Sequence, residues 1–96
     1  MTEESLWQLV RTETFLRALR KYLRKHHERE TAVRRVLEAL SQDPHSPSLR
    51  LHALRGNKSG LHAVRVTYGD RIILILAIKN REIVLLDIGS HDKAYR

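Results

Sequence analysis

The chain has 96 residues, no cysteine and a formal net charge of +7 at pH 7. This length predicts a single domain, residues 1–96, and the lack of cysteine excludes disulfide bridges and thiolate metal sites. The longest apolar run, residues 72–78, is far shorter than the ~20 residues of a membrane-spanning helix, so we expect a cytoplasmic protein without membrane contact. Nine basic and four acidic residues in the second half, residues 49–96, predict a basic surface that attracts polyanions.

The first half of the chain predicts a short strand followed by two helices. Residues 6–11 are mainly apolar and predict the strand. Apolar side chains then recur at helical spacing over about residues 13–25, with basic side chains on the other side, which predicts an amphipathic helix. Residues 26–28 interrupt this pattern and predict a turn. A second apolar stripe at residues 33–40 predicts a second helix, which the Asp43-Pro44 pair ends because proline cannot continue the hydrogen-bond ladder.

The second half of the chain predicts a loop and then three strands. Residues 43–60 are rich in Pro, Ser, His, Asn and Gly and predict a loop, with a brief ordered piece at residues 49–54. Strands are expected at residues 61–67, 71–78 and 82–88, and the short turns between them require an antiparallel meander. The nearly uninterrupted apolar sequence of the middle strand predicts burial on both faces. The result is an α+β fold, in which a helical hairpin packs on a small twisted, mainly antiparallel sheet.

The chemistry-bearing side chains favour phosphodiester cleavage over metal or nucleophile catalysis. The six histidines include no helical pair with metal-ligand spacing, and no serine stands in a strand-to-helix elbow, so we expect no metal and no other cofactor. Arg65 and Arg71 flank one tight turn, and His91 follows the third strand at the same end of an antiparallel sheet. Guanidinium groups bind phosphate oxygens, and an imidazole transfers protons near neutral pH. Taken singly, each of these residues would also fit an ordinary surface position.

Three separated segments resemble, in order and spacing, motifs of the RelE/ParE superfamily of toxins. They are residues 51–61, residues 71–73 and residues 87–95, and the likeness is strongest to the YafQ-like branch with its Gly-x-His ending. The resemblance covers nearly the whole chain and implies a RelE-like fold with the order β-α-α-β-β-β. The chain departs from the family pattern at Leu61 and Asp70, where aromatic residues are usual.

The resemblance also implies a reaction and roles for individual residues. Relatives of this kind are toxins of bacterial or archaeal type II toxin–antitoxin systems that enter the ribosomal A site and cut mRNA, leaving a cyclic phosphate. By position, His91 would be the general acid or base, Arg71 would hold the phosphate and Tyr95 would orient a base. Arg65 and His52 match positions where relatives place side chains of the active cleft. The residues expected to contact RNA are Arg55, Lys58, Lys93 and Asp70.

The implied partners are a cognate antitoxin, with which the chain would form a hetero-oligomer, and ribosomal RNA beside the mRNA. Two other functions on the same fold stay open. One is a ParE-like inhibitor of DNA gyrase, against which the Gly-x-His ending at residues 89–91 argues. The other is an inactive member that binds an antitoxin without cleaving RNA, which the missing aromatic residues would fit.

Overall fold

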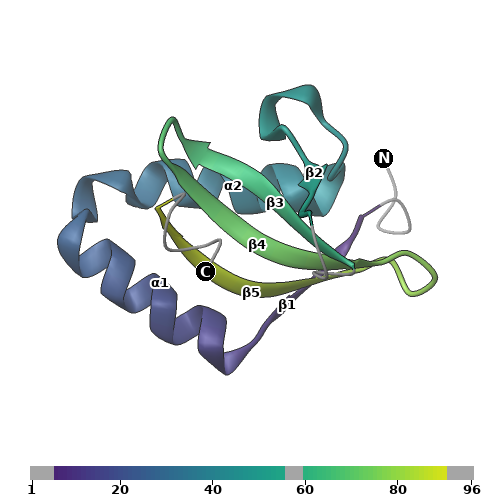
Figure 1. The fold of residues 1–96 in the computed structure, drawn as a ribbon, viewed down its shortest axis with the longest axis horizontal. Helices are drawn as coiled ribbons and strands as arrows, with labels where there is room; N and C mark the ends of the chain where they lie inside the picture. Colours follow the sequence, from purple (N-terminus) through teal and green to yellow (C-terminus); the bar gives the residue numbers. More distant parts are fainter. Residues whose placement is uncertain (1–5, 56–59, 91–96) are drawn as a thin grey trace.

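The computed structural model describes residues 6–55 and 60–90 as two helices packed on one side of a curved sheet (Figure 1). The elements are β1 (Gln8–Arg11), α1 (Glu13–Lys25), the 3-10 helix η2 (His27–Arg29), α2 (Glu30–Gln42), the 3-10 helix η3 (Pro47–Leu49), β2 (His52–Ala53), β3 (Leu61–Thr67), β4 (Asp70–Ala77) and β5 (Glu82–Ser90). The five strands form one sheet in the order β1-β5-β4-β3-β2, and only β1 and β5 run parallel. The predicted α+β arrangement is confirmed.

The boundaries differ from the prediction at several places, among them the end of β4 at Ala77 instead of residue 78. The ordered piece expected in the loop contains a two-residue edge strand, β2, which pairs with His62 and Ala63. β1 begins at Gln8 rather than at residue 6. β4 begins at Asp70, which was expected to be part of the turn, and β5 runs through Gly89 to Ser90 instead of ending at residue 88. The last two differences have one cause, because Asp70 and Ser90 pair with each other and lengthen both strands.

The core lies mainly between the helices and the sheet. Its fully buried members include Phe15 of α1, Leu40 of α2 and Leu74 of β4. A second, smaller cluster on the other face of the sheet consists of Leu54, Ala63 and Ile73. Residues 72–74 of β4 therefore point alternately into the two clusters and are all buried, which confirms the predicted double burial for these three residues. The prediction is wrong for the rest of the strand, where residues 75–77 are partly buried and Ile78 is exposed. No helix in the described part of the chain is long and apolar enough to cross a membrane.

Thr12 fixes the start of α1 and joins it to the sheet. Its hydroxyl oxygen accepts a hydrogen bond from the backbone N–H of Phe15 (3.1 Å), which satisfies one of the free donors of the first helical turn. The same hydroxyl donates to the carbonyl of Leu85 in β5 (2.7 Å). One side chain thus sets both the first residue of the helix and its position against the sheet.

Thr12→Ala should therefore lower the free energy of unfolding by about 1–2 kcal/mol, because it leaves a helix N-terminus and a strand carbonyl without their partner. Urea denaturation monitored by circular dichroism measures this change. Thr31→Ala, at an exposed position in the first turn of α2, is the matched control and should change stability by less than about 0.5 kcal/mol. Equal effects of the two substitutions would contradict the capping role.

Candidate functional site

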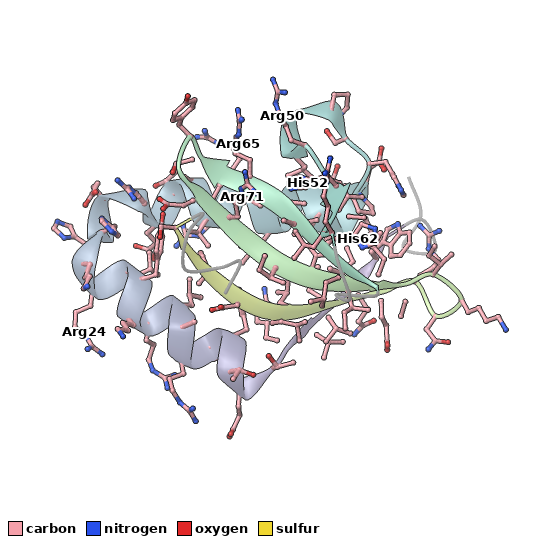
Figure 2. The ribbon with its side chains drawn as sticks, in the orientation of Figure 1. Arg24, Arg50, His52, His62, Arg65 and Arg71 are labelled. Carbon is pink, nitrogen blue, oxygen red and sulfur yellow. The ribbon has the colours of Figure 1, made fainter. Side chains whose placement is uncertain are left out.

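Three of the residues expected in the site lie together on the sheet face that the helices leave open. Arg65 of β3 is the direct register partner of Arg71 of β4, and His52 of β2 is the partner of Ala63. Directly paired residues and residues two apart point to the same face of a sheet. His52, Arg65 and Arg71 therefore share the face of Ala63 and Ile73, and Figure 2 labels these three side chains.

The contacts of His52 fit the tautomer that carries its proton on Nδ1. Nδ1 lies 2.9 Å from the backbone carbonyl of Arg50, and a carbonyl can only accept, so we assign the proton to Nδ1. Nε2 then carries the lone pair, and it lies 3.4 Å from Nη1 of Arg71, which can only donate. The proton-accepting atom of the ring is thus held beside a guanidinium group. A phosphate bound by Arg71 would lie next to this atom.

Arg50 belongs to this cluster and was missed by sequence reasoning. It follows η3 in the left-handed conformation, with φ 53° and ψ 46°, which a non-glycine residue rarely adopts. The unusual backbone accompanies the carbonyl contact to His52, and the side chain is exposed (Figure 2). The local sequence contains no signal for this role, because nothing distinguishes Arg50 from other loop arginines.

An exposed aromatic ring completes the cluster. The guanidinium carbon of Arg65 lies 5.8 Å from the ring centroid of Tyr68, within the range of a cation–π contact, and Tyr68 is 94% exposed. Within the described residues, neither Arg50 nor Arg65 forms an ion pair with a carboxylate. The cluster therefore offers cationic groups and a free ring face, which are the groups that bind single-stranded nucleic acid. Sequence reasoning treated Tyr68 only as a turn residue.

Asp70 requires a correction, since it was expected to contact RNA. Adjacent strand residues point to opposite faces, so Asp70 lies on the helix side while Arg71 lies on the open face. The carboxylate is buried, and its Oδ2 accepts hydrogen bonds from Tyr22 (2.7 Å), Thr67 (2.8 Å) and Arg29 (2.5 Å). With three donors on one oxygen inside the protein, this side chain serves the fold rather than a nucleic-acid surface.

The hydroxyl of Tyr22 stays protonated in this environment. Burial is the main cause that raises the pKa of Tyr22 to about 12, and the neighbouring Asp70 carboxylate adds to the effect. Hydrogen bonding to Tyr22 raises the pKa of Arg29 above its ordinary value. At neutral pH the network therefore contains a neutral phenol donor and a charged guanidinium donor.

Of the remaining expected site residues, only Arg55 lies within the described part of the chain. Arg55 is exposed in the loop after β2. Lys58, His91, Lys93 and Tyr95 lie outside the described residues. The last described residues of β5 are informative, because Gly89 pairs with Arg71 and Ser90 with Asp70. The chain thus reaches residue 90 at the end of the sheet that carries Arg71, as predicted from the two tight turns.

A metal site was a further possibility, given the histidines. Among residues 6–55 and 60–90, no group of three or more His, Cys, Asp or Glu side chains could hold a metal ion. The charged groups that do meet in the described site are cations, which suit an anionic ligand.

Solved bacterial toxins share this architecture. YafQ from E. coli strain BL21(DE3) matches with a TM-score of 0.77 and 14% identity, covering 94% of this chain and 99% of that chain. The E. coli DinJ-YafQ toxin-antitoxin complex matches with a TM-score of 0.76 and 14% identity, with coverages of 95% and 99%. The RelBE2 toxin-antitoxin complex from Mycobacterium tuberculosis matches with a TM-score of 0.69 and 21% identity, with coverages of 90% and 99%. The fold is therefore that of the RelE-like toxins.

A comparison of sequences identifies the family to which the chain belongs. The profile of the family described as "Bacterial toxin of type II toxin-antitoxin system, YafQ" matches residues 7–96. The chain therefore belongs to the YafQ family of toxins, and the resemblance inferred from its motifs is confirmed. No single curated protein matches the chain by sequence.

Proposed function

We propose that this toxin is an endoribonuclease that cuts mRNA in the ribosomal A site, without a metal ion. The observation that carries the proposal is the juxtaposition of Arg65, Arg71 and Nε2 of His52 on one open sheet face. RNA carries its own nucleophile, the 2′-hydroxyl beside each phosphate. A protein needs only to align this group, stabilise the added charge and move two protons.

The reaction uses the cluster as follows. Arg71 and Arg65 bind the non-bridging oxygens of the scissile phosphate and stabilise the phosphorane. One imidazole removes the proton of the 2′-hydroxyl while this oxygen bonds to phosphorus, and a second imidazole gives a proton to the departing 5′-oxygen. The products are a 2′,3′-cyclic phosphate and a 5′-hydroxyl. The place of Nε2 beside Arg71 suits His52 to the first step, which leaves the acid step to His91.

Other residues would hold the RNA around the scissile bond. We assign the stacking of a base to Tyr95, in line with the family resemblance, and to the exposed ring of Tyr68. Arg50, whose backbone carbonyl contacts His52, supplies a further exposed cation. The expected contacts of Arg55, Lys58 and Lys93 would follow the phosphate backbone on either side.

The partner proposed for this toxin is an acidic antitoxin protein. The solved relatives include toxin-antitoxin complexes, DinJ-YafQ and RelBE2. A formal net charge of +7 would favour rapid association with an acidic partner through electrostatic attraction. Contacts to ribosomal RNA would use the same excess of positive charge.

The proposal is tested by adding the purified toxin to a translation extract that contains a reporter mRNA. Primer extension should map cuts within translated codons, and the upstream fragments should end in a cyclic phosphate. Naked RNA in the same buffer should be cut much more slowly. Intact mRNA in the presence of folded toxin would overturn the proposal, and inhibition of gyrase supercoiling without cleavage would favour the ParE-like function.

His52→Ala should lower the cleavage rate by about 10²–10⁴-fold, because it removes the group that accepts the proton of the 2′-hydroxyl. The matched control is His62→Ala, one strand position along β3 from Ala63 and therefore on the opposite sheet face. Single-turnover cleavage on programmed ribosomes measures both variants. Similar rates for the two would remove His52 from the mechanism.

A further inference from the structure

The buried carboxylate of Asp70 is unusual in this protein. Asp70 is the one charged residue that is buried among residues 6–55 and 60–90, and no buried side-chain nitrogen or oxygen in that part of the chain lacks a hydrogen-bond partner. A buried ion pair adds little stability compared with apolar packing, because removing both charges from water costs free energy. The contribution of the Asp70 ion pair therefore lies in the fixed positions of the groups that it joins, rather than in stability.

The donors of the network come from elements that are far apart in the sequence. Tyr22 lies in the last part of α1, and Arg29 lies in η2, between the two helices. Arg29 approaches both the carboxylate and the Tyr22 hydroxyl, the latter at 3.5 Å. Thr67, the third donor, is the last residue of β3. A single oxygen of Asp70 thus connects the helical hairpin to the turn between β3 and β4.

Asp70 is also where the strand ends of the candidate site meet. It is the first residue of β4, directly before Arg71, and its register partner is Ser90, the last residue of β5. Because side chains alternate along a strand, holding the Asp70 side chain on the helix side fixes the backbone from which Arg71 projects on the open side. The pairing with Ser90 connects the last residue of β5 to the same point.

We infer that Tyr22, Arg29 and Thr67 form, together with Asp70, a positioning unit that holds the ends of β4 and β5 in the geometry needed for RNA cleavage. Asp70, which the other three contact, is buried on the helix side of the sheet, away from the open face of Arg71. The role of the unit is to place Arg71 and the paired strand end at Ser90, so this inference rests on the proposed function. A misplacement of reacting groups by about 1 Å can cost as much as 10²-fold in rate, which gives a remote network a measurable effect.

Two substitutions disturb the unit while leaving its shape nearly intact. Tyr22→Phe removes one donor and keeps the ring in the core, and Arg29→Met removes the charged donor and keeps most of the side-chain length. Arg34→Met is the matched control, because Arg34 forms an exposed i,i+4 ion pair with Glu30 (3.0 Å) in the same helical hairpin. Arg29→Lys tests rescue, since it restores the charge.

The first measurement is amide hydrogen exchange by NMR on the full chain, which does not depend on RNA cleavage. In Tyr22→Phe and Arg29→Met, exchange should become at least about tenfold faster at Asp70, Arg71, Gly89 and Ser90, and stay unchanged at Leu74 and Leu85 in the middle of the same strands. A uniform increase along both strands would mean a merely destabilised fold and would overturn the inference. Unchanged exchange at the strand ends would overturn it as well.

The second measurement is cleavage on programmed ribosomes at a temperature where every variant is folded. The turnover number kcat should fall about 10-fold to 100-fold in Tyr22→Phe and Arg29→Met, with KM changed less than about twofold. Arg34→Met should match the wild type, and Arg29→Lys should recover part of the loss. An unchanged kcat beside a cleaving wild type overturns the positioning role. A wild type that does not cleave contradicts the proposed function instead, and the exchange data then decide on the positioning unit.

Discussion

Arg71→Ala should lower the rate of mRNA cleavage by about 10²–10³-fold, the loss expected when one preorganised donor to a developing anion is removed. Arg71 lies between its register partners Arg65 and Gly89 and has Nη1 3.4 Å from Nε2 of His52. A phosphate bound there would contact both the cation and the proton acceptor. In the proposed reaction the guanidinium would stabilise the charge that forms in the transition state and would orient the base.

Three comparisons make this prediction specific. Arg71→Lys should recover only part of the rate, because an ammonium group cannot bind two phosphate oxygens in the planar manner of a guanidinium. Arg34→Ala removes one positive charge from the exposed face of α2 and should leave cleavage nearly unchanged. The thermal unfolding midpoints of Arg71→Ala, Arg71→Lys and Arg34→Ala should all stay close to that of the wild type. If Arg34→Ala slows cleavage as much as Arg71→Ala, overall charge and not the cluster controls the reaction.

Local signals explain which parts of this fold could be predicted from the sequence. The helix over residues 13–25 was placed correctly, because its apolar spacing and the N-cap Thr12 lie within one segment. The strand over residues 61–67 was placed correctly because it alternates and ends at a tight turn. The parallel pairing of β1 with β5 joins residues more than 70 positions apart, and no local pattern encodes it.

Local signals also explain which parts of the candidate site could be predicted from the sequence. The meeting of Arg65 and Arg71 followed from the short turn between their strands and is seen in the register. The place of His52 depends on the two-residue strand β2, which is too short to produce a periodic signal, so only the family resemblance indicated it. The environment of Asp70 was predicted incorrectly, because a residue assigned to a turn has no defined face. Its partner Tyr22 stands 48 positions away.

The largest effect on stability is expected at a residue far from the candidate site. Phe15 is fully buried between α1 and the sheet, so Phe15→Ala leaves a cavity as well as losing apolar contacts. The expected loss is about 3–5 kcal/mol, which is a large part of the roughly 5–15 kcal/mol that holds an ordinary small domain folded. Urea denaturation should show a lower midpoint with an unchanged slope.

The matched control for Phe15→Ala is Ile78→Ala at the turn after β4, where the side chain is 67% exposed and the change should stay within about 0.5 kcal/mol. Neither residue touches the cationic cluster, so the folded fraction of each variant should cleave mRNA at the wild-type rate. A core substitution should thus lower stability and leave the cleavage rate of the folded protein unchanged. Arg71→Ala should instead lower the cleavage rate and leave stability unchanged. A cost below about 1 kcal/mol for Phe15→Ala would mean that the helices contribute far less to the core than this packing implies.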